Sequence, residues 1–312
     1  MTPSFYFMKS PTLTVHDHTL TWGSRTYVMG ILNVTPDSFS GDGLYRSSPL
    51  HPSPSGRGNG GEGIEAALEQ ARGFLASGAD ILDVGGESTR PGSQPVGAEE
   101  ELARVLPVVR RIAAEFPQAL ISVDTYKARV AEAALKAGAH IVNDVWGLRA
   151  DPDLARVAAR FGAPVILMHN RSNPASVDVR ERLGNAYLGA EYTDLIEDVK
   201  RELMESVQIA LSAGVVETHI VLDPGIGFGK TREQNLELIN RLGEIRALGY
   251  PVLLGPSRKS FIGYTLDLPP DQRVEGTAAA VAVGITRGAD IIRVHDVKEM
   301  ARVAKMTDAL VR

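Results

Sequence analysis

Residues 120–143 read LISVDTYKARVAEAALKAGAHIVN, and this stretch contains a structural unit that the rest of the chain repeats. It begins with the apolar run Leu120–Val123, continues through a helical segment at 126–137 and ends with a second apolar run, Ala139–Val142. Short continuous apolar runs are typical of parallel strands that are covered on both faces. A helix between two such runs predicts a βαβ unit.

The same alternation continues on both sides of this unit. The other apolar runs are Val28–Leu32, Ile81–Val84, Val165–Met168, Ile220–Leu222, Val252–Leu254 and Ile291–Val294. The other helical segments are 64–75, 102–116, 153–161, 195–211, 236–245, 273–287 and 297–311, with glycine stops at 78, 214 and 249. Eight βα units predict a (β/α)8 TIM barrel that occupies the whole chain, 1–312, as a single domain. The alternative, an open doubly wound sheet, usually has about six strands and would leave two units unassigned.

The segment before the first unit predicts a β-hairpin. Residues 13–22 alternate apolar and polar side chains on both sides of Asp17-His18, which is a turn signal. His16 and His18 could form a metal-binding pair, but two histidines at the tip of a hairpin are more often simply exposed.

Residues 46–61, RSSPLHPSPSGRGNGG, interrupt the repeat after the first strand. Eleven of these sixteen residues are Ser, Pro or Gly. Such a segment buries too little apolar surface to offset the entropy lost on ordering, so we predict a flexible loop insertion.

Composition excludes several classes of protein. The chain has 312 residues, of which 44% are hydrophobic and 23% charged, and this balance is ordinary for a globular domain. The absence of cysteine excludes disulfide scaffolds, cysteine nucleophiles and thiolate metal sites, and fits a cytoplasmic location. A net charge of −5 without blocks of like charge argues against nucleic-acid binding. No apolar run is long enough to predict a membrane span.

Polar residues follow the strands, where the active sites of TIM barrels form. They are Asn33, Asp83, Asp124, Asn143, His169, Asp223, Ser257, Arg258, Lys259, Arg293 and His295, with Thr89 and Arg90 in the loop after the second strand. We expect these side chains to converge on one mouth. Asp124, Asn143 and Asp223 suit the donor edge of a flat heterocycle. The cations and donors Arg90, Lys259, Arg293 and His295 suit phosphate. The alternative is that the acids and bases only form salt bridges around the top of the barrel.

Two apparent motifs do not meet their definitions. Gly225 and Gly229 enclose three residues, whereas a Walker A motif needs four between its glycines. Residues 255–259, GPSRK, lack the second glycine of a nucleophile elbow, which argues against a serine hydrolase.

Eight segments together resemble the dihydropteroate synthase family. They are MGILNVTPDSFS (29–40), DVGGESTRPG (83–92), SVDTYKA (122–128), VND (142–144), LMH (167–169), LDPGIGFGK (222–230), SRKS (257–260) and RVHD (293–296). The resemblance implies a TIM barrel, a homodimer, a Mg²⁺ cofactor and a role in folate biosynthesis as a sulfonamide target. The implied reaction joins 6-hydroxymethyl-7,8-dihydropterin diphosphate to 4-aminobenzoate and releases diphosphate, by a dissociative route in which mobile loops exclude water.

The resemblance also implies residue roles. The residues implied to bind the pterin are Asp124, Asn143, Met168, Asp223, Phe228 and Lys259. The residues implied to bind the diphosphate are Thr89, Arg90, Arg293 and His295. The 4-aminobenzoate pocket falls to Thr89, Ser257 and Lys259, and the magnesium site to Asn33. The implied catalytic residues are Asp124, Lys259, Arg293 and His295, although no general acid or base is named among them.

The chain departs from the family pattern in its first loop. The family usually reads SFSDGG there, whereas residues 38–43 read SFSGDG, which displaces the acid to Asp42. Two alternatives remain at this point, a pterin-binding methyltransferase barrel and a non-catalytic pterin-binding protein. The methyltransferase has no need for a diphosphate site, so the GGESTRPG, SRKS and RVHD segments argue against it.

Overall fold

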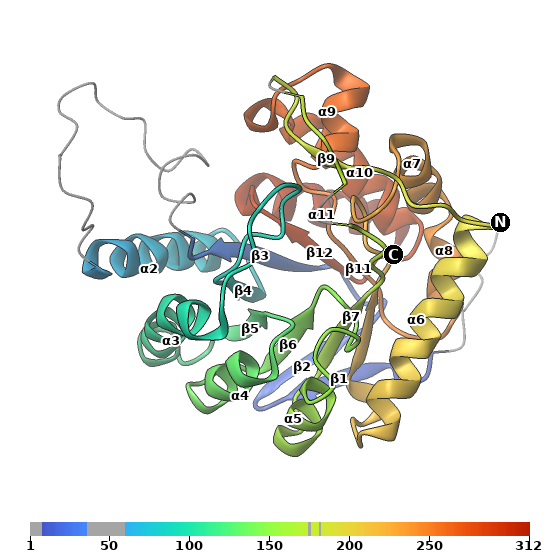
Figure 1. Cartoon of the computed structure of the whole chain (residues 1–312). Coiled ribbons are helices and arrows are strands. Elements are labelled where there is room, and N and C mark those ends of the chain that lie inside the picture. Colours follow the sequence, from blue (N-terminus) through green and yellow to red (C-terminus); the bar gives the residue numbers. More distant parts are fainter. Residues whose placement is uncertain (1–7, 36–59, 174–175, 181) are drawn as a thin grey trace, which may run out of the picture.

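The fold is known from a computed structural model that describes residues 8–35, 60–173, 176–180 and 182–312. Eight parallel strands form one sheet in the order β10-β7-β6-β5-β4-β3-β12-β11. Their bounds are β3 Tyr27–Asn33, β4 Ile81–Gly85, β5 Leu120–Asp124, β6 Ile141–Asp144, β7 Val165–Met168, β10 Ile220–Asp223, β11 Leu253–Leu254 and β12 Ile291–Val294. Helices surround this sheet (Figure 1), so the predicted (β/α)8 barrel is confirmed.

The barrel closes between β10 and β11 through a narrow seam. Val252, just before β11, forms a parallel bridge with Leu222 of β10. The N–H of Leu222 donates to the carbonyl oxygen of Pro251 at 2.9 Å. Among the described residues this is one bridged pair, whereas β3 and β4 pair through five residues each. The seam is therefore the least extensively paired part of the sheet.

The N-terminal end of the barrel interior is an apolar layer. Every strand contributes to it: Tyr27 and Met29 come from β3, and the other strands supply Ile81, Leu120, Ile141, Ile166, Val221, Leu253 and Ile291. The antiparallel hairpin of β1 (Thr12–Val15) and β2 (His18–Thr21) packs Leu13, Val15 and Leu20 into the same cluster. The predicted hairpin is confirmed, and it covers this end of the barrel because its own apolar face needs burial.

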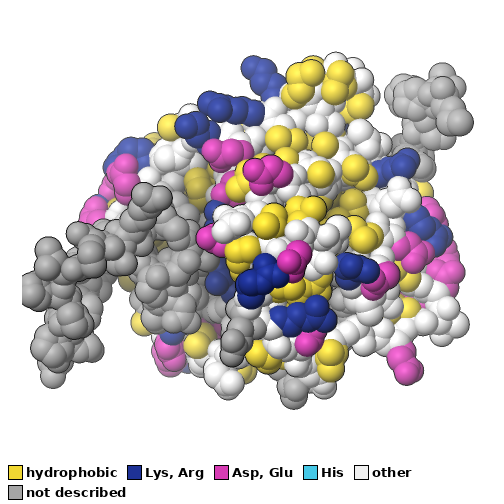
Figure 2. All heavy atoms as spheres, turned by 90° about the horizontal axis from the view of Figure 1, so that it is seen from above, with side chains coloured by type: hydrophobic (Ala, Val, Ile, Leu, Met, Phe, Trp, Pro, Cys, Tyr) yellow, Lys and Arg dark blue, Asp and Glu magenta, His cyan; other side chains and the backbone are white. Residues whose placement is uncertain are grey.

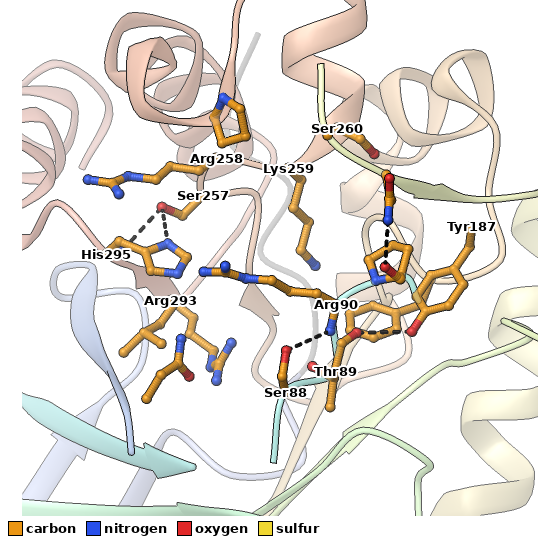
Figure 3. Close-up of a pocket in the computed structure, with 18 of the residues that line it drawn as sticks. Ser88, Thr89, Arg90, Tyr187, Ser257, Arg258, Lys259, Ser260, Arg293 and His295 are labelled. Atoms are coloured by element: carbon orange, nitrogen blue, oxygen red, sulfur yellow. Dashed lines mark hydrogen bonds between the residues drawn. The ribbon is translucent and has the colours of Figure 1, made fainter. Parts of the chain in front are cut away.

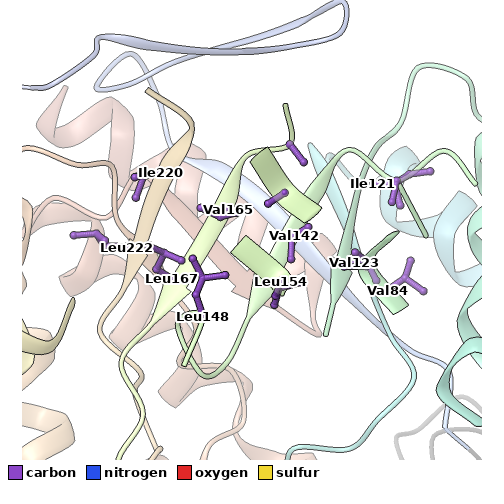
Figure 4. Close-up of a cluster of buried hydrophobic side chains, with 14 of the residues drawn as sticks. Val84, Ile121, Val123, Val142, Leu148, Leu154, Val165, Leu167, Ile220 and Leu222 are labelled. Carbon is purple, nitrogen blue, oxygen red and sulfur yellow. The ribbon is translucent and has the colours of Figure 1, made fainter. Parts of the chain in front are cut away.

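The opposite face of the strands packs against the helices. Val84, Val123, Val142 and Leu167 point outward into a continuous apolar cluster (Figure 4). Successive side chains of a strand point to opposite faces, so one strand supplies both the helix-facing core and the barrel interior. This explains why the runs are apolar throughout rather than alternating.

Ten helices follow the strands within the described residues. They are α2 Gly60–Ala76, α3 Ala98–Glu115, α4 Ala128–Lys136, α5 Leu154–Phe161, α6 Leu195–Ser212, α7 Arg232–Asn240, α8 Leu242–Arg246, α9 Ser260–Leu266, α10 Val274–Thr286 and α11 Val297–Val311. The predicted glycine stops are confirmed, since Gly78, Gly214 and Gly249 have φ values of +98°, +95° and +91°. Such left-handed positions favour glycine after a helix.

Three features differ from the sequence-based expectation. The single helix predicted at 236–245 is wrong: α7 ends and α8 begins around Arg241, whose backbone is not helical (φ −101°, ψ 17°). The Thr231 side chain caps α7 and starts it earlier than its apolar periodicity suggests. The short helix α9 and the two-residue strands β8 (Val177–Asp178) and β9 (Ala186–Tyr187) were not predicted, because elements of this length show no clear periodicity.

Most of the predicted insertion, 46–61, lies outside the described residues, as does Asp42. Residues 60 and 61 begin α2, so the predicted insertion extends two residues too far. In the part of the chain that the structure describes, we find no helix with the length and apolar character needed to cross a membrane.

Candidate functional site

A cavity of about 340 Å³ lies at the C-terminal ends of the strands. Ten of the residues predicted for the mouth line it: Asn33, Thr89, Arg90, Asp124, Phe228, Ser257, Arg258, Lys259, Arg293 and His295. Figure 3 shows Lys259 pointing into this space, with Ser257 and His295 on one side and Tyr187 on the other. The expected convergence of strand ends on one mouth is confirmed for these residues.

Three further predicted residues do not line this cavity. Asn143, Met168 and Asp223 are buried at the ends of β6, β7 and β10. Asn143 donates from Nδ2 to Asp83 Oδ2 at 3.0 Å, and Asp223 Oδ1 accepts from the N–H of Gly225 at 2.7 Å. Their polar groups are thus held in place by neighbours in the protein.

Arg293 of β12 joins two buried carboxylates at the centre of the site. Its Nε donates to Asp83 Oδ2 at 2.6 Å and its Nη2 donates to Asp124 Oδ2 at 2.5 Å. Asp83 is fully buried, and its Oδ1 has no hydrogen-bond partner. Because a buried carboxylate needs a counter-charge, Arg293 is the group that makes this pair of acids tolerable.

Burial raises the pKa of both interior acids. The pKa of Asp124 rises to about 7 through burial, against the opposing effect of Arg293. Burial also raises the pKa of Asp223, while Lys259, the Gly225 N–H, Arg293 and the buried Lys230 oppose the rise. Both carboxyls sit where desolvation strengthens hydrogen bonds to a ligand, because the local dielectric constant is low.

Lys259 lies between these acids and an aromatic wall. Its ammonium donates to the carbonyl oxygen of Ile226 and lies 4.6 Å from the centre of the Phe228 ring. The Tyr187 ring lies 6.0 Å beyond Phe228. Burial lowers the pKa of Lys259 to about 8, with Asp223 opposing the change. The two rings and the amine together form one side of the cavity.

A second group of side chains makes one end of the cavity positive. Ser257 Oγ lies 3.0 Å from His295 Nδ1 and also accepts from the backbone N–H of His295 at 3.2 Å. Burial lowers the pKa of His295 well below its ordinary value, and the neighbouring cations add to the effect. Those cations are Arg258, Arg293, Arg90 and Lys259. A site with this potential attracts an anionic group.

The loop that carries Thr89 and Arg90 is anchored by a buried ion-pair network. The Lys127 ammonium pairs with Glu87 in the loop and with Glu101 of α3. Tyr126 Oη donates to Glu87 Oε1 at 3.0 Å. On the other side, Tyr187 Oη donates to the carbonyl oxygen of Thr89 at 3.0 Å. The loop therefore has fixed contacts on both flanks of the cavity.

The expectation that His169 faces the mouth is wrong. It is buried, its Nδ1 contacts Lys230 Nζ at 3.0 Å, and its Nε2 lies 3.1 Å from Glu202 Oε2. Met168 precedes it on the inward side of β7, so alternation turns His169 outward toward α6. The polar residue after a strand is not always an inward one.

Some cavity residues were not anticipated from the sequence. They are Glu87, Tyr187 and Arg273, which line the cavity. Asp83, by contrast, was expected at the mouth, and it does lie inside the barrel: it follows Ile81 of the apolar layer by two residues along β4 and pairs with Arg293. Tyr187 lies on the short strand β9, where the sequence carries no comparable signal.

The described residues provide no cluster of three acidic or histidine side chains able to hold a metal ion. The His16 ring instead meets the His140 ring edge to face, with ring centres 4.8 Å apart. Asn33 is left as the predicted magnesium residue at the cavity.

Comparison with known proteins agrees with this geometry. Residues 29–295 match the family model described as pterin binding enzyme. The dihydropteroate synthase of Bacillus subtilis is 51% identical over 291 residues, which are 93% of this chain and 90% of that protein. A dihydropteroate synthase structure from Yersinia pestis with a sulfonamide drug has a TM-score of 0.82 at 39% identity, covering 96% of this chain and 98% of that one. One from Xanthomonas albilineans with 4-aminobenzoic acid has a TM-score of 0.81 at 38% identity, with the same coverage.

The barrel, its acidic interior and the family match define a pterin-binding enzyme of the TIM-barrel class. Within that class, the chain belongs to the dihydropteroate synthase family, the transferases of folate biosynthesis. The methyltransferase and the non-catalytic alternatives find no support among these relatives.

Proposed function

We propose that the cavity condenses 6-hydroxymethyl-7,8-dihydropterin diphosphate with 4-aminobenzoate, giving 7,8-dihydropteroate and diphosphate. One observation supports this most strongly: Arg293 contacts Asp124 directly and also acts on His295 at the positive end of the cavity. A single small molecule could therefore reach the acids with a heterocycle and the cations with a charged leaving group. Loss of the bond between them is the reaction that this polarity favours.

In this proposal the pterin passes Asp124, which lines the cavity, and reaches the more deeply buried Asn143 and Asp223 behind it. Asp124 and Asp223 would accept hydrogen bonds from ring N–H and amino groups, and Asn143 can donate as well as accept. Lys259 would donate to a ring acceptor, with Phe228 against the ring face and Met168 as apolar packing. Hydrogen bonds to charged acceptors are the strong ones, so the two acids should dominate pterin affinity.

The cations hold the diphosphate. Arg90, Arg293 and His295 would contact its oxygens, with Thr89 beside them. Because burial and cations keep His295 neutral at pH 7, it would serve as a hydrogen-bond donor rather than as a charge. Arg293 would then exchange its contact with Asp124 for one with the substrate.

Magnesium is compatible with the residues present. Mg²⁺ is commonly bound by one or two protein oxygens together with substrate phosphates and water. Asn33 offers a single amide oxygen at the cavity, which fits a metal ion that arrives with the diphosphate. Asn33 would hold it there, and the ion would neutralise charge on the leaving diphosphate.

The 4-aminobenzoate site would lie beside the loop 86–92 and the start of α9. Thr89, Ser257 and Lys259 all line that part of the cavity. The Xanthomonas relative was crystallised with 4-aminobenzoic acid and the Yersinia relative with a sulfonamide drug. We extend both ligand classes to this chain, which makes sulfonamide inhibition an expected property.

In the proposed step the bond from the pterin methylene carbon to the diphosphate oxygen breaks, and the oxygen keeps both electrons. The electron-rich dihydropterin stabilises the resulting cation until the amine nitrogen bonds to the methylene carbon and loses a proton. An aromatic amine is largely unprotonated at pH 7, so no general base is required. Asp124, Lys259, Arg293 and His295 act by binding and by electrostatic stabilisation, and exclusion of water protects the cation.

The surface of α7, α9 and α10 is proposed as the contact between two copies of the chain. The α10 sequence VEGTAAAVAVGIT is apolar around most of its circumference. Leu236, Leu266 and Val283 are 44%, 45% and 42% exposed and border an apolar groove of about 260 Å³. Figure 2 views the side of the molecule that carries α9, where hydrophobic side chains are exposed in several places. A helix that is apolar all round requires a partner, and a second copy would bury it.

We also propose that the protein is located in the cytoplasm, which the absence of cysteine fits.

A diphosphate-release assay tests the proposed reaction. Purified protein with both substrates and Mg²⁺ should release diphosphate, and omission of either substrate should reduce release to background. Calorimetry with the free pterin should show loss of binding in Asp223→Ala, since the substitution removes a buried charged acceptor worth about 1.5–3 kcal/mol. Unchanged pterin affinity in that variant would contradict the assignment of the pocket.

A further inference from the structure

Two residues of the recognised motifs have no role in the proposed reaction, although both are buried. They are Lys230, at the end of the LDPGIGFGK segment, and His169, at the end of LMH. Lys230 is 3% exposed and His169 is 1% exposed. A buried ammonium is costly unless its donors are matched, so its partners show what it holds together.

Each N–H of the Lys230 ammonium has an acceptor. Its Nζ lies 2.9 Å from the carbonyl oxygen of Gly225, 3.1 Å from that of Phe228 and 3.0 Å from His169 Nδ1. Three donors therefore meet three acceptors. Lys230 thus ties both ends of the 225–228 turn to the end of β7.

The contact with Lys230 also defines the tautomer of His169. Nδ1 accepts from the ammonium, so the proton resides on Nε2; this atom lies 3.1 Å from Glu202 Oε2 on α6, an electrostatic contact without the geometry of a hydrogen bond. The reverse tautomer would place a lone pair against the carboxylate. Burial and the charge of Lys230 lower the pKa of His169 to about 4, in keeping with a neutral ring. Glu202 is fixed in turn by Arg171, whose Nε donates to it at 2.9 Å.

The turn that this chain of contacts holds carries the pterin site. The N–H of Gly225 donates to Asp223, and Phe228 forms the aromatic wall of the cavity. The backbone approach is close, because a Cβ on Gly225 would lie 1.8 Å from the carbonyl oxygen of His169. Gly225 also has a φ of +70°, which favours glycine. A shift of the turn would therefore move the acceptor and the wall together.

We propose that Lys230 and His169, backed by Glu202, are positioning residues that hold Asp223 and Phe228 in register for the pterin, and that neither contacts substrate. The proposal rests on the proposed pterin pocket. It predicts a selective defect: the pterin side of the site loosens, together with the Lys259 contact to Ile226, while Thr89 on the loop 86–92 and Ser257 keep their geometry.

The central test is Lys230→Met, which removes the three donors and keeps most of the stem. We expect the KM for the pterin diphosphate and the Kd for the free pterin to rise about 10- to 100-fold, since displacements of about 1 Å have effects of this size. The KM for 4-aminobenzoate should change much less, because Thr89 and Ser257 are held by contacts outside the turn. If Lys230→Met does not fold, Glu202→Gln and His169→Gln provide milder versions, and His169→Gln should retain more pterin affinity than His169→Leu because an amide oxygen can still accept from Lys230.

Arg246→Met is a matched control for stability. Arg246 forms a buried ion pair with Asp290, at 2.8 Å, near the starts of β11 and β12. The control should lower the melting temperature but leave pterin affinity unchanged. Lowered stability of Lys230→Met with normal pterin affinity, or equal losses for both substrates, would overturn the proposal. If Asp223→Ala also retained pterin binding, the proposed pocket itself would be wrong; if only the Lys230 and His169 variants bound normally, the positioning role alone would fail.

Discussion

Replacement of Arg293 by methionine should destabilise the protein in a pH-dependent manner. Arg293 is the counter-charge of two buried acids, Asp83 and Asp124, at 2.6 and 2.5 Å. Removing one partner of a buried ion pair costs about 3–5 kcal/mol, because the remaining charge is left uncompensated. We expect a loss of this size in the free energy of unfolding at about pH 8.5, where Asp124 is ionised in the parent protein.

The sign of the pH dependence follows from Asp124. Its folded pKa, about 7, is above its unfolded value, so the folded state binds a proton that the unfolded state has lost, and stability falls as pH rises toward 7. Arg293 opposes this rise in pKa, so its removal raises the pKa further. In Arg293→Met the free energy of unfolding therefore continues to fall above pH 7, whereas in the parent protein it no longer changes with the titration of Asp124. The destabilisation is therefore smaller at about pH 6 than at about pH 8.5.

Urea unfolding at these two pH values, followed by circular dichroism without ligands, measures both effects. In the double variant Asp124→Asn/Arg293→Met, the extra loss between the two pH values should disappear because the titrating acid is gone. A loss below about 1 kcal/mol would refute the buried-pair argument. An equal loss at both pH values would show that Asp124 does not titrate where its burial indicates.

Three further outcomes are expected. Gly225→Ala should lower the free energy of unfolding by about 2 kcal/mol or more, because the added Cβ would lie 1.8 Å from the carbonyl oxygen of His169. Gly97→Ala is the control: its Cβ would enter open space, so thermal unfolding of this variant should be almost unchanged. Val283→Glu should convert a dimer to a monomer in light scattering after size exclusion; a dimer that persists would place the interface elsewhere. Deletion of 47–59, which stops before α2, should shift the melting temperature by no more than about 2 °C, because the composition of this segment predicts a loop that buries little apolar surface; a large drop would contradict that prediction.

The sequence predicted the barrel because eight short apolar runs alternate with helical segments, and few folds are compatible with that pattern. It predicted much of the mouth for a related reason: the carboxyl ends of parallel strands meet at one end of a barrel. Asp124 and Arg293 could thus be brought together although 169 positions separate them. The short elements β8, β9 and α9 escaped prediction, and with them Tyr187.

His169 shows why the remainder was harder. When a strand is apolar on both faces, its sequence does not show which of its alternating side chains face the barrel interior and which face the helices. The apolar layer of the structure provides that phase: counting by two from Ile81 reaches Asp83, and counting by two from Ile166 reaches Met168 and passes over His169. Lys230 could not be placed at all, because one of its partners, His169, lies 61 positions away at the end of another strand.

The narrow pairing between β10 and β11 has a consequence for breathing motions. Asp223 ends one strand beside this seam, and Lys259 follows the other. A ligand that bridges these two side chains would hold β10 and β11 together where the barrel has its fewest strand-to-strand hydrogen bonds. Amide hydrogens at Leu222 and along β11 should therefore exchange with solvent sooner than those of β3 and β4 in the empty enzyme, and pterin should slow them more than any others in the sheet.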